Sequence, residues 1–350
     1  MLPLAEPPQS LCILRLSALG DTCHVVPIVR TLQQAWPATQ LTWIIGGTEA
    51  RLMSLIEGVE FITVDRGLRF AGLARLRREL RGRSFDVLLH LQLALRASLA
   101  ASCVRARVKL GFDRARAREL QWLFTNARIA PRTREHVLDS FFGFPAALGV
   151  GERLLRWDLP LPQAARAYAA RLIPDAQPTL IVSPCSSHPR RNWPAARYAA
   201  LAEHAVSRHG MRVILAGGRS PLEARTGSDI ERACAAPLVN QIGRDTLPEL
   251  LALLARATVL ATPDSGPAHM ATMVGTPVIG LYAATNPARS GPYLSGRWCV
   301  NAYPEAARRF RGCEPEALPW NHKIEEAGVM DLVTIDAVRG KLDELLGSRT

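Results

Sequence analysis

Residues 262–269, with the sequence TPDSGPAH, place a carboxylate, hydroxyl groups and an imidazole around one tight turn. The apolar run before them predicts a strand, and the small residues after them predict the start of a helix. A helix start presents unpaired N–H groups and the positive end of the helix dipole, which together bind phosphate. Asp264, Ser265 and His269 would surround that anion. The same residue types also cap ordinary helices, so the octapeptide alone supports a phosphate site and a plain capped turn equally.

A second candidate site follows the first apolar run, in the sequence RLSALGDTCH of residues 15–24. It has neither the G-x-G-x-x-G pattern of dinucleotide sites nor the G-x-x-x-x-G-K-[ST] pattern of P-loops. It does place a carboxylate, Asp21, at the start of a predicted helix. Asp21 could act as a general base or cap the helix, and the two roles are compatible. His24, three residues on, is either a second candidate base or a hydrogen-bond partner of Asp21.

Strands and helices alternate along the first half of the chain, which predicts right-handed βαβ units and a parallel sheet. Both candidate sites would then follow the carboxyl ends of strands. We expect strands over residues 11–16, 41–45, 61–64, 85–90 and 108–111, and helices over 21–36, 49–56, 68–81, 95–104, 116–124 and 135–148.

The alternation loosens over residues 149–174, where Pro160, Pro162 and Pro174 predict a linker and a domain boundary. It then restarts. We expect strands over residues 179–183, 212–216, 238–240, 258–262 and 277–282, and helices over 194–209, 221–235, 247–255, 267–274 and 335–346.

This pattern predicts an α/β protein of two Rossmann-like domains, residues 1–160 and 161–330. A C-terminal helix within residues 331–350 is expected to pack back on the first domain. Ligands of such sheets bind outside the carboxyl ends of the strands, so the site is expected in a cleft between the two halves.

The composition is that of a folded protein. The 350 residues are 48% apolar and 21% charged, enough for two cores, and no apolar run reaches the roughly 18 residues of a membrane span. The first ten residues lack the features of a secretion signal. Seven scattered cysteines without C-x-x-C spacing argue against a zinc site or a disulfide framework. We therefore expect a cytoplasmic protein.

Positive charge is concentrated in one segment. Residues 66–118 hold fourteen basic and three acidic residues, which gives eleven of the twelve net positive charges of the chain. Such a segment is either a solvated face or a site for nucleic acid, an acidic membrane or a phosphorylated substrate. Three phenylalanines, Phe70, Phe85 and Phe112, are few for base stacking, so we expect no nucleic-acid partner.

The motif R-L-S-A-L-G-D-x-x-H of residues 15–24, followed by D-S-G-P-x-H of residues 264–269, resembles the lipopolysaccharide heptosyltransferases of glycosyltransferase family nine. The middle segment, residues 92–126, resembles the branch that adds the first heptose to the inner core. The resemblance covers about residues 11–293. Supporting matches are Ser186 and Ser187, R-N-W-P at 191–194, Gly217 and Gly218, Gly243, T-N-P at 285–287 and G-P-Y at 291–293.

The resemblance implies a GT-B type fold of two Rossmann-like domains that needs no cofactor. It implies an ADP-heptose donor held mainly by the C-terminal half, and an acceptor, the Kdo of lipid A, held by the N-terminal half. We therefore expect a monomer at the cytoplasmic face of the inner membrane, which accounts for a basic segment without a membrane span. The expected acceptor-binding residues are Arg66, Arg69, Arg96 and Arg118.

Inverting transfer needs a base for the acceptor hydroxyl and positive charge for the departing diphosphate. By resemblance, the base is Asp21. Arg191 stands where relatives carry a lysine near the diphosphate, and Arg190 could share that role. The other expected donor contacts are Ser17, Ser186 and Ser187, Glu223 to the ribose, Asp264 to the heptose, the Ser265 and Gly266 amides, and His269 to the diphosphate.

No metal is expected, because the chain has no Asp-x-Asp pair of the kind that holds Mg²⁺ or Mn²⁺ in transferases of the other major fold. The nearest rival function is a transferase or epimerase of the same fold that uses another nucleotide sugar. A more distant rival is a nucleic-acid-binding protein without enzymatic activity.

Overall fold

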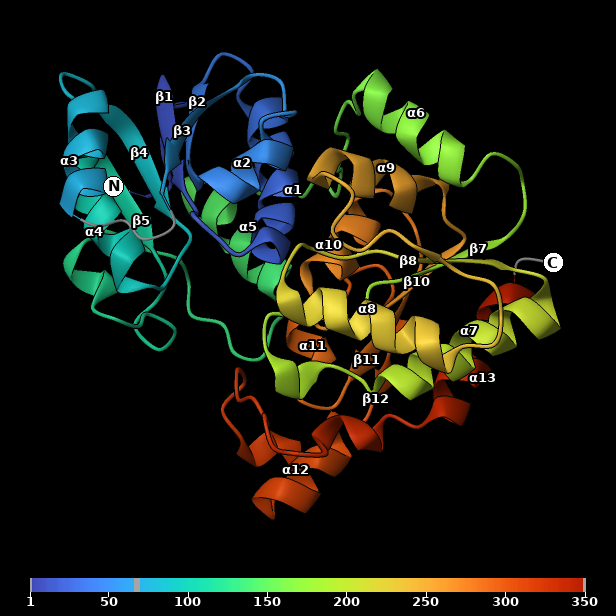
Figure 1. Ribbon diagram of the computed structural model, residues 1–350. Coiled ribbons are helices and arrows are strands. Elements are labelled where there is room, and N and C mark those ends of the chain that lie inside the picture. Colours follow the sequence, from blue (N-terminus) through green and yellow to red (C-terminus); the bar gives the residue numbers. More distant parts are fainter. Residues whose placement is uncertain (1, 66–69, 349–350) are drawn as a thin grey trace. The chain divides into compact units, whose positions relative to one another are not determined.

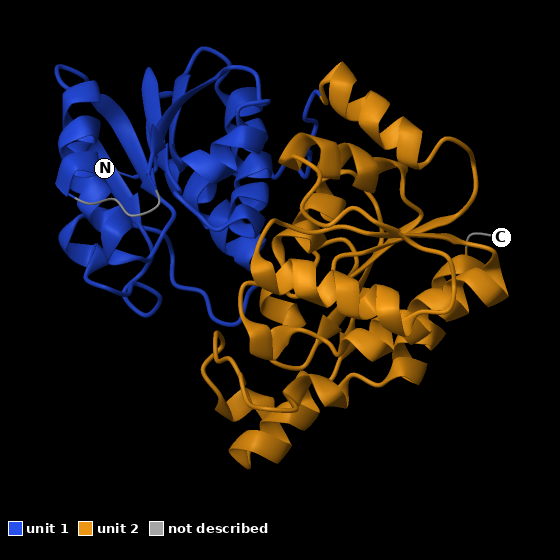
Figure 2. Cartoon of the chain, viewed as in Figure 1, with its two compact units in different colours: residues 1–160 blue, residues 161–350 orange. Residues whose placement is uncertain are grey.

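The computed structural model describes residues 2–65 and 70–348. The chain divides into two compact units, Met1–Pro160 and Leu161–Thr350 (Figure 2). Each unit has its own parallel sheet and its own buried core.

The described strands of the first unit form a parallel sheet in the order β3-β2-β1-β4-β5-β6. Leu14 pairs with both Ile44 and His90, so the carboxyl ends of β1, β2 and β4 meet at one edge. The strands are β1 (Ser10–Leu14), β2 (Gln40–Gly46), β3 (Val59–Val64), β4 (Phe85–His90), β5 (Ala106–Gly111) and β6 (Ala127–Arg128).

Helices cover both faces of this sheet. In Figure 1, α3 and α4 lie on one face, and α1, α2 and α5 lie on the other. Side chains alternate along β1, so Cys12 and Leu14 join the core beneath α3 and α4, and Leu11 and Ile13 point to the opposite face. The helices are α1 (Leu19–Ala35), α2 (Gly47–Met53), α3 (Phe70–Glu79), α4 (Leu95–Cys103) and α5 (Val137–Leu148).

The described strands of the second unit repeat this arrangement in the order β12-β11-β10-β7-β8-β9, again all parallel. In both units the chain starts in the middle of the sheet and winds first to one side and then to the other. The strands are β7 (Thr179–Val182), β8 (Arg212–Leu215), β9 (Val239–Asn240), β10 (Val259–Pro263), β11 (Val278–Tyr282) and β12 (Val300–Asn301).

In the second unit, α7, α8 and α13 lie on one face of the sheet, and α6, α9 and α10 lie on the other (Figure 1). Tyr198 and Leu201 of α7 share the core with strands β7 and β8. The helices are α6 (Gln163–Leu172), α7 (Ala195–His209), α8 (Pro221–Ala233), α9 (Leu247–Arg256), α10 (Gly266–Met273), α11 (Pro287–Ser290), α12 (Tyr303–Arg311) and α13 (Ile335–Gly347).

The C-terminal helix was expected on the first unit, but its buried stripe packs within the second. Val338, Leu342 and Leu345 of α13 are buried in the core of the second unit, where the helix packs against α7 and β11. The apolar stripe of α13 is thus covered within its own unit.

Two segments differ from their predicted structure. The predicted helix over residues 116–124 is a series of turns with a 3-10 turn at Gln121–Leu123, because Glu119 and Leu120 take left-handed backbone angles. The predicted linker over residues 149–174 contains α6, whose Ala165 and Ala169 are buried where it packs on α9. No helix was predicted where α12 lies, and α12 buries Tyr303.

Candidate active site

The strand order places a switch point in each sheet, between β1 and β4 in the first unit and between β7 and β10 in the second. At such a point, neighbouring connections run to opposite faces and leave a crevice at the carboxyl ends of the strands. After β1 come Ser17 in the loop and Asp21 in the first turn of α1, and after β4 comes Arg96 in the first turn of α4. The loops after β7 and β10 carry Arg191 and Asp264. Both motif regions therefore lie where this fold binds ligands.

Asp21 lies in the first turn of α1, and its carboxylate is held on one side. Arg15, at the end of β1, forms an ion pair with Oδ2, and the backbone N–H of Ala18 donates to the same oxygen at 3.5 Å. The helix cap is Ala18, so Asp21 is not the N-cap residue. Among the described residues, the hydrogen bonds to Asp21 all end on Oδ2. With 33% of its side chain exposed, Asp21 can present Oδ1 to a ligand.

Arg15 is itself fixed by the sheet. Its Nη1 donates to the carbonyl of Leu91 after β4, and its guanidinium lies 5.3 Å from the ring centroid of Phe141 on α5. The side chain is 11% exposed. Because β4 and α5 hold Arg15 from two sides, the position of the Asp21 carboxylate is set by the core of the first unit.

Ser17 completes this loop. Its hydroxyl accepts a hydrogen bond from Arg96 of α4 and another, at 3.4 Å, from Nε2 of Gln92. Gln92 also accepts the backbone N–H of Leu16 at 2.8 Å, which ties the loop after β1 to the loop after β4. The Ser17–Ala18 peptide bond is cis. Arg96 is thus placed beside the Asp21 loop, as an acceptor-binding residue would be.

The other residues predicted for the first unit differ in their exposure and in whether the structure describes them. Arg118 lies on the exposed side of its turn, and Arg66 and Arg69 fall outside the described residues. His24 is buried at 2% exposure, with its ring edge-on to His136 at 5.3 Å between centroids. Burial makes His24 a poor candidate for the base.

In the second unit, residues 262–269 form the predicted strand, turn and helix. Thr262 is buried, and its hydroxyl donates to the carbonyl of Ser183 at 2.8 Å and contacts the Ser265 hydroxyl at 2.8 Å. Ser265 is the cap residue of α10, but no side-chain hydrogen bond caps the helix. The N–H of Gly266 therefore keeps the capacity to bind an anion, whereas Pro267 has no N–H and the N–H of Ala268 donates to the Ser265 carbonyl at 3.2 Å.

A cluster of charged residues stands beside this turn. Nε of Arg191 donates to Oε1 of Glu325 at 2.8 Å, and its Nη1 lies 3.9 Å from Oδ2 of Asp264. Burial raises the pKa of Glu325, but the hydrogen bonds from Arg191 and the positive charge around the carboxylate together outweigh it, so the pKa lies below its ordinary value. The Arg191 side chain, 12% exposed, is fixed next to the start of α10.

Lys323 belongs to the same cluster. Its side chain is exposed, yet partial burial of the ammonium and the positive charge of Arg191 both lower its pKa, which Glu325 and Asp264 partly offset. A lysine in this electrostatic field gains from an added anion, because a phosphate would relieve the repulsion from Arg191. Lys323 and Arg191 are therefore the cations that a diphosphate would meet in this unit.

The remaining expected donor contacts are engaged to different degrees. Ser186 uses its hydroxyl within its own loop, donating to the carbonyl of His188 at 3.0 Å, whereas Ser187 is exposed. Both oxygens of Glu223 bind the start of α8, through the Gly218 N–H at 2.6 Å and the Ser220 hydroxyl at 2.6 Å. Glu223 thus forms a capping box, and a ribose contact would add to these bonds.

His269 lies inside the first turns of α10 and is 7% exposed. Its position in the chain places it beside the anion site formed by the start of that helix. The structure therefore brings Arg191, Asp264, Ser265 and Gly266 together with His269 in one unit, as the sequence predicted for the donor site.

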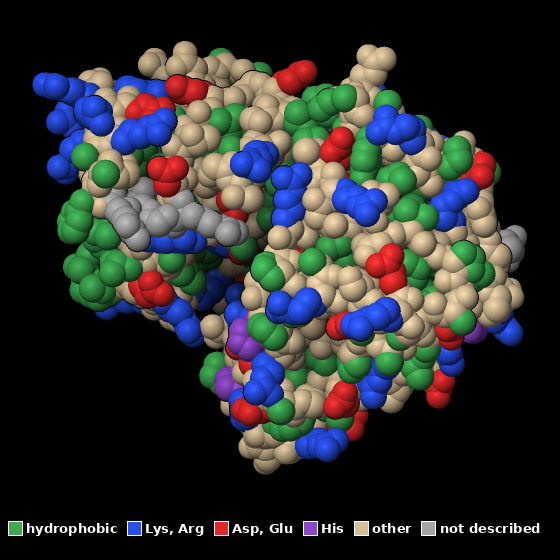
Figure 3. Space-filling model, viewed as in Figure 1, with side chains coloured by type: hydrophobic (Ala, Val, Ile, Leu, Met, Phe, Trp, Pro, Cys, Tyr) green, Lys and Arg blue, Asp and Glu red, His purple; other side chains and the backbone are tan. Residues whose placement is uncertain are grey.

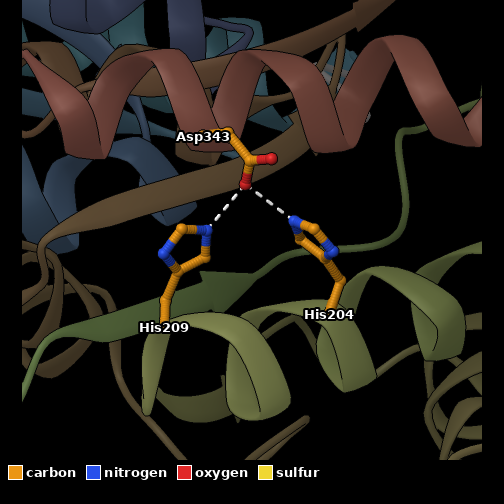
Figure 4. A group of neighbouring side chains, drawn as sticks. All are labelled: His204, His209 and Asp343. Atoms are coloured by element: carbon orange, nitrogen blue, oxygen red, sulfur yellow. Dashed lines mark hydrogen bonds and ion pairs between the residues drawn. The ribbon is translucent and has the colours of Figure 1, made fainter.

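One group of side chains has the composition of a metal site (Figure 4). His204 and His209 of α7 both direct Nε2 to the same oxygen, Oδ1 of Asp343 on α13, at 2.7 and 2.6 Å. Two ligands bound to one tetrahedral zinc stand about 3.3 Å apart, given zinc–nitrogen distances near 2.0 Å. The shorter distances are those of charge-assisted hydrogen bonds. This cluster links α7 to α13.

Comparisons with known structures define the class of protein. The crystal structure of a family 9 glycosyltransferase from Veillonella parvula has a TM-score of 0.79 and 22% identity, and the match covers 97% of both chains. The E. coli heptosyltransferase WaaC with ADP-2-deoxy-2-fluoro heptose has a TM-score of 0.70 and 21% identity, over 96% of this chain and 99% of that one. The fold is that of a GT-B type glycosyltransferase.

Sequence comparison defines the family. Residues 73–317 match the model of glycosyltransferase family 9 (heptosyltransferase). The lipopolysaccharide core heptosyltransferase OpsX of Haemophilus influenzae is 38% identical over 340 residues, which are 97% of this chain and 98% of OpsX. The chain belongs to glycosyltransferase family 9, and the resemblance inferred from its motifs is confirmed.

Each unit holds one half-site, the residues around Asp21 in the first and those around Arg191 in the second. No role was assigned from the sequence to four of these residues: Arg15, Gln92, Lys323 and Glu325. Arg15 and Gln92 directly follow strands at the switch point, and that position was a usable signal. Lys323 and Glu325 lie in a stretch without strand or helix periodicity, 132 and 134 residues from Arg191. Nothing local in the sequence connects them to it.

Proposed function

We propose that the chain transfers heptose, with inversion, from ADP-heptose to the Kdo sugar of the lipid A-linked inner core. The observation that carries the proposal is the Asp21 carboxylate, held through Oδ2 by Arg15 at the switch point of the first unit. The first unit is the acceptor-binding half, and the second is the donor-binding half.

On the acceptor side, Asp21 takes the proton of the attacking Kdo hydroxyl as its oxygen bonds to the anomeric carbon of heptose. Arg15 keeps Oδ2 in place, so that Oδ1 faces the acceptor. Arg96, held at the Ser17 hydroxyl, binds the carboxylate of Kdo.

On the donor side, the bond from the anomeric carbon to the ADP oxygen breaks, and the electron pair leaves with ADP. Arg191, Lys323 and the Gly266 N–H at the start of α10 stabilise the negative charge that develops on the diphosphate. Asp264, beside Arg191, accepts hydrogen bonds from heptose hydroxyls.

The relatives support these substrates. OpsX is a heptosyltransferase of the lipopolysaccharide core. The structure of WaaC has been solved with ADP-2-deoxy-2-fluoro heptose. For the acceptor, support comes from the likeness of residues 92–126 to enzymes that add the first heptose. Nucleic acid is a poorer partner, because Phe85 and Phe112 are both buried and cannot stack on bases.

The proposed enzyme acts as a monomer on a glycolipid at the cytoplasmic face of the inner membrane. None of the described helices is both long enough and apolar enough to cross a bilayer. The proposed enzyme reaches the acceptor from the membrane surface. The basic charge within residues 66–118 favours a membrane surface that is anionic.

The test is incubation of the purified chain with ADP-heptose and Kdo-lipid A, with heptose addition measured by mass spectrometry. We expect one heptose per acceptor and release of ADP. Parallel reactions with UDP- and GDP-sugars separate this function from that of another sugar transferase. Turnover of one of those donors, with none of ADP-heptose, would disprove the proposed donor.

A further inference from the structure

Exposed apolar side chains of the first unit gather in one part of the chain. Among the described residues, nine large hydrophobic side chains are exposed, and six of them lie between residues 70 and 123. We call the five of these that lie on α4 and on the turn before β6 the apolar face: Leu95, Leu99, Leu120, Trp122 and Leu123. Soluble proteins rarely expose such groups together unless the surface binds something.

The fold brings these side chains together. Leu95 and Leu99 are one turn apart on α4 and share its outer side. The N–H of Leu95 donates to Oε2 of Glu119 at 2.6 Å, which joins the start of α4 to the turn that carries Trp122. In the space-filling view, hydrophobic side chains gather over α4, and Lys and Arg side chains gather over the neighbouring α3 (Figure 3).

The turn is built to point its apolar residues outward. Gln121 is fully buried, and its Nε2 donates to the carbonyls of His90 and Gln92 at 2.9 and 3.2 Å. Leu120 has a φ of 60°, an unfavourable angle for a branched side chain. The anchored Gln121 thus holds Leu120 and its neighbours in solvent at a cost in backbone energy, which marks the turn as a candidate functional element.

The charge around the apolar face is positive. Arg75, Arg77 and Arg78 of α3 are exposed, as are Arg114 and Arg118 at the turn. The nearby acidic residues are Glu79, on α3, and Glu119, whose carboxylate binds α4. An apolar surface bordered by arginines complements a layer of lipid with anionic headgroups.

We propose that the apolar face docks on the surface of an anionic phospholipid bilayer. Leu95, Leu99 and Leu123 enter the boundary between headgroups and acyl chains. Trp122 lies at the headgroup level, where indole rings are favoured, and the arginines of α3 bind lipid phosphates. Apolar insertion and electrostatic attraction together hold a protein at a membrane that neither would hold stably alone.

The location of the apolar face connects docking to the reaction, and this step rests on the proposed function. Leu95 is followed directly by Arg96, which binds Ser17 in the loop that carries Asp21. A bilayer against Leu95 therefore brings its headgroup sugars to the Asp21 loop. The acceptor would be presented to the base without leaving the membrane.

The test is co-sedimentation of the full chain with vesicles of phosphatidylcholine alone or with added phosphatidylglycerol. We expect binding only with phosphatidylglycerol, and a loss of at least about tenfold in the Trp122→Ser/Leu123→Ser double variant. The matched control is Leu294→Ser, which replaces an exposed leucine of the second unit and should bind normally. Arg77→Glu/Arg78→Glu should also lose binding, whereas Arg232→Glu on α8 should not.

Unchanged vesicle binding by the Trp122→Ser/Leu123→Ser variant would overturn the proposal, as would equal wild-type binding to neutral vesicles. Concentration-dependent self-association that this variant abolishes would assign the face to a second copy of the chain instead.

A transfer assay separates docking from catalysis. The double variant should match wild type on a deacylated Kdo acceptor and be slower on the vesicle-embedded one. Absence of transfer by wild type to both acceptors would reject the proposed function and leave the vesicle result standing.

Discussion

Arg15 and Asp21 form an ion pair across the loop that joins β1 to α1. The pair connects the proposed base to the sheet, because Arg15 also donates to the Leu91 carbonyl after β4 and lies over the ring of Phe141. Movement of the loop alone would break these contacts. The carboxylate is therefore pre-positioned before any acceptor binds, which is how a static group contributes most to catalysis.

Replacement of Asp21 by asparagine should remove transfer and spare donor binding. Asparagine keeps the shape of the side chain but cannot accept the acceptor proton, so we expect kcat to fall by about 10³-fold. ADP binding, measured by calorimetry, should stay within about twofold of wild type, because the expected donor contacts are mostly in the second unit. Wild-type turnover by Asp21→Asn would assign the base to another group.

Arg15 should act as a positioning residue, through Asp21. The Arg15→Gln variant loses the ion pair, and we expect kcat to fall by about tenfold to a hundredfold with the KM for ADP-heptose unchanged. Arg15→Lys should recover part of the rate, since a lysine can still pair with Oδ2 but loses the fork that reaches Leu91. Equal losses in both variants, together with a lower melting temperature, would indicate a purely structural role.

Arg191 and Lys323 should bind the diphosphate, and Arg190 should not. Arg191 is 12% exposed and lies beside Asp264, whereas Arg190 is exposed to solvent. We expect Arg191→Met and Lys323→Met each to weaken ADP binding by about tenfold, most strongly at low salt. Arg190→Met is the matched control and should bind ADP normally. A larger effect from Arg190 would move the diphosphate away from the Asp264 turn.

Local patterns predicted the elements that hold the half-sites. The apolar run of β4 was placed at Phe85–His90, as observed, because a buried parallel strand is continuously hydrophobic. Asp21 and Asp264 were also placed near helix starts from local patterns, because each follows an apolar run and precedes a helical one. The predicted helix around Arg116 is wrong because the segment is held by a contact outside it: Arg116 pairs with Glu135, nineteen residues away.

Contacts between distant residues set the limit of the sequence prediction. Arg191 was predicted to lie near the diphosphate, and the structure places it beside Asp264, but its bonds to Glu325 span 134 residues. Helix α6 was missed since its segment is rich in proline, although only its buried alanines, Ala165 and Ala169, decide how it packs. Contacts between residues so distant in sequence can be identified only from the folded structure.

Asp245 should make the protein less stable as the pH rises. Burial raises the pKa of its carboxyl to about 7, and among the described residues its buried Oδ2 has no hydrogen-bond partner. A raised pKa means that the folded state binds the proton more tightly, so stability falls between about pH 4 and pH 7. Asp245→Asn removes this loss and should stabilise the protein by about 3 kcal/mol at pH 8 and far less at pH 5.

Denaturant unfolding of wild type and Asp245→Asn at pH 5 and pH 8 measures this difference. Asp229→Asn is a suitable control, because that exposed carboxylate pairs with Arg232 on the surface of α8. It should change the free energy of unfolding by less than about 1 kcal/mol at either pH. An equal effect of Asp245→Asn at both pH values would show that Asp245 does not titrate in this range.

The cluster of His204, His209 and Asp343 should stabilise the second unit at neutral pH. Burial raises the pKa of Asp343, but the hydrogen bonds from His209 and His204 outweigh it, so the pKa lies below its ordinary value. A carboxyl with a lowered pKa contributes stability above its unfolded pKa, near 4, and loses it as the pH falls further. Asp343→Asn should therefore destabilise the protein at pH 7, and the difference should shrink below about pH 4.

We expect a loss of about 1 kcal/mol, because the Asp343 side chain is 35% exposed and solvent screens its interactions. Asp336→Asn on the same helix is the control, since that carboxylate is 91% exposed and should have no measurable effect on unfolding. If Asp343→Asn unfolds like wild type at pH 7, the link between α7 and α13 is carried by Leu342 and its apolar neighbours alone. The buried stripe of α13 would then be sufficient to hold the C-terminal helix.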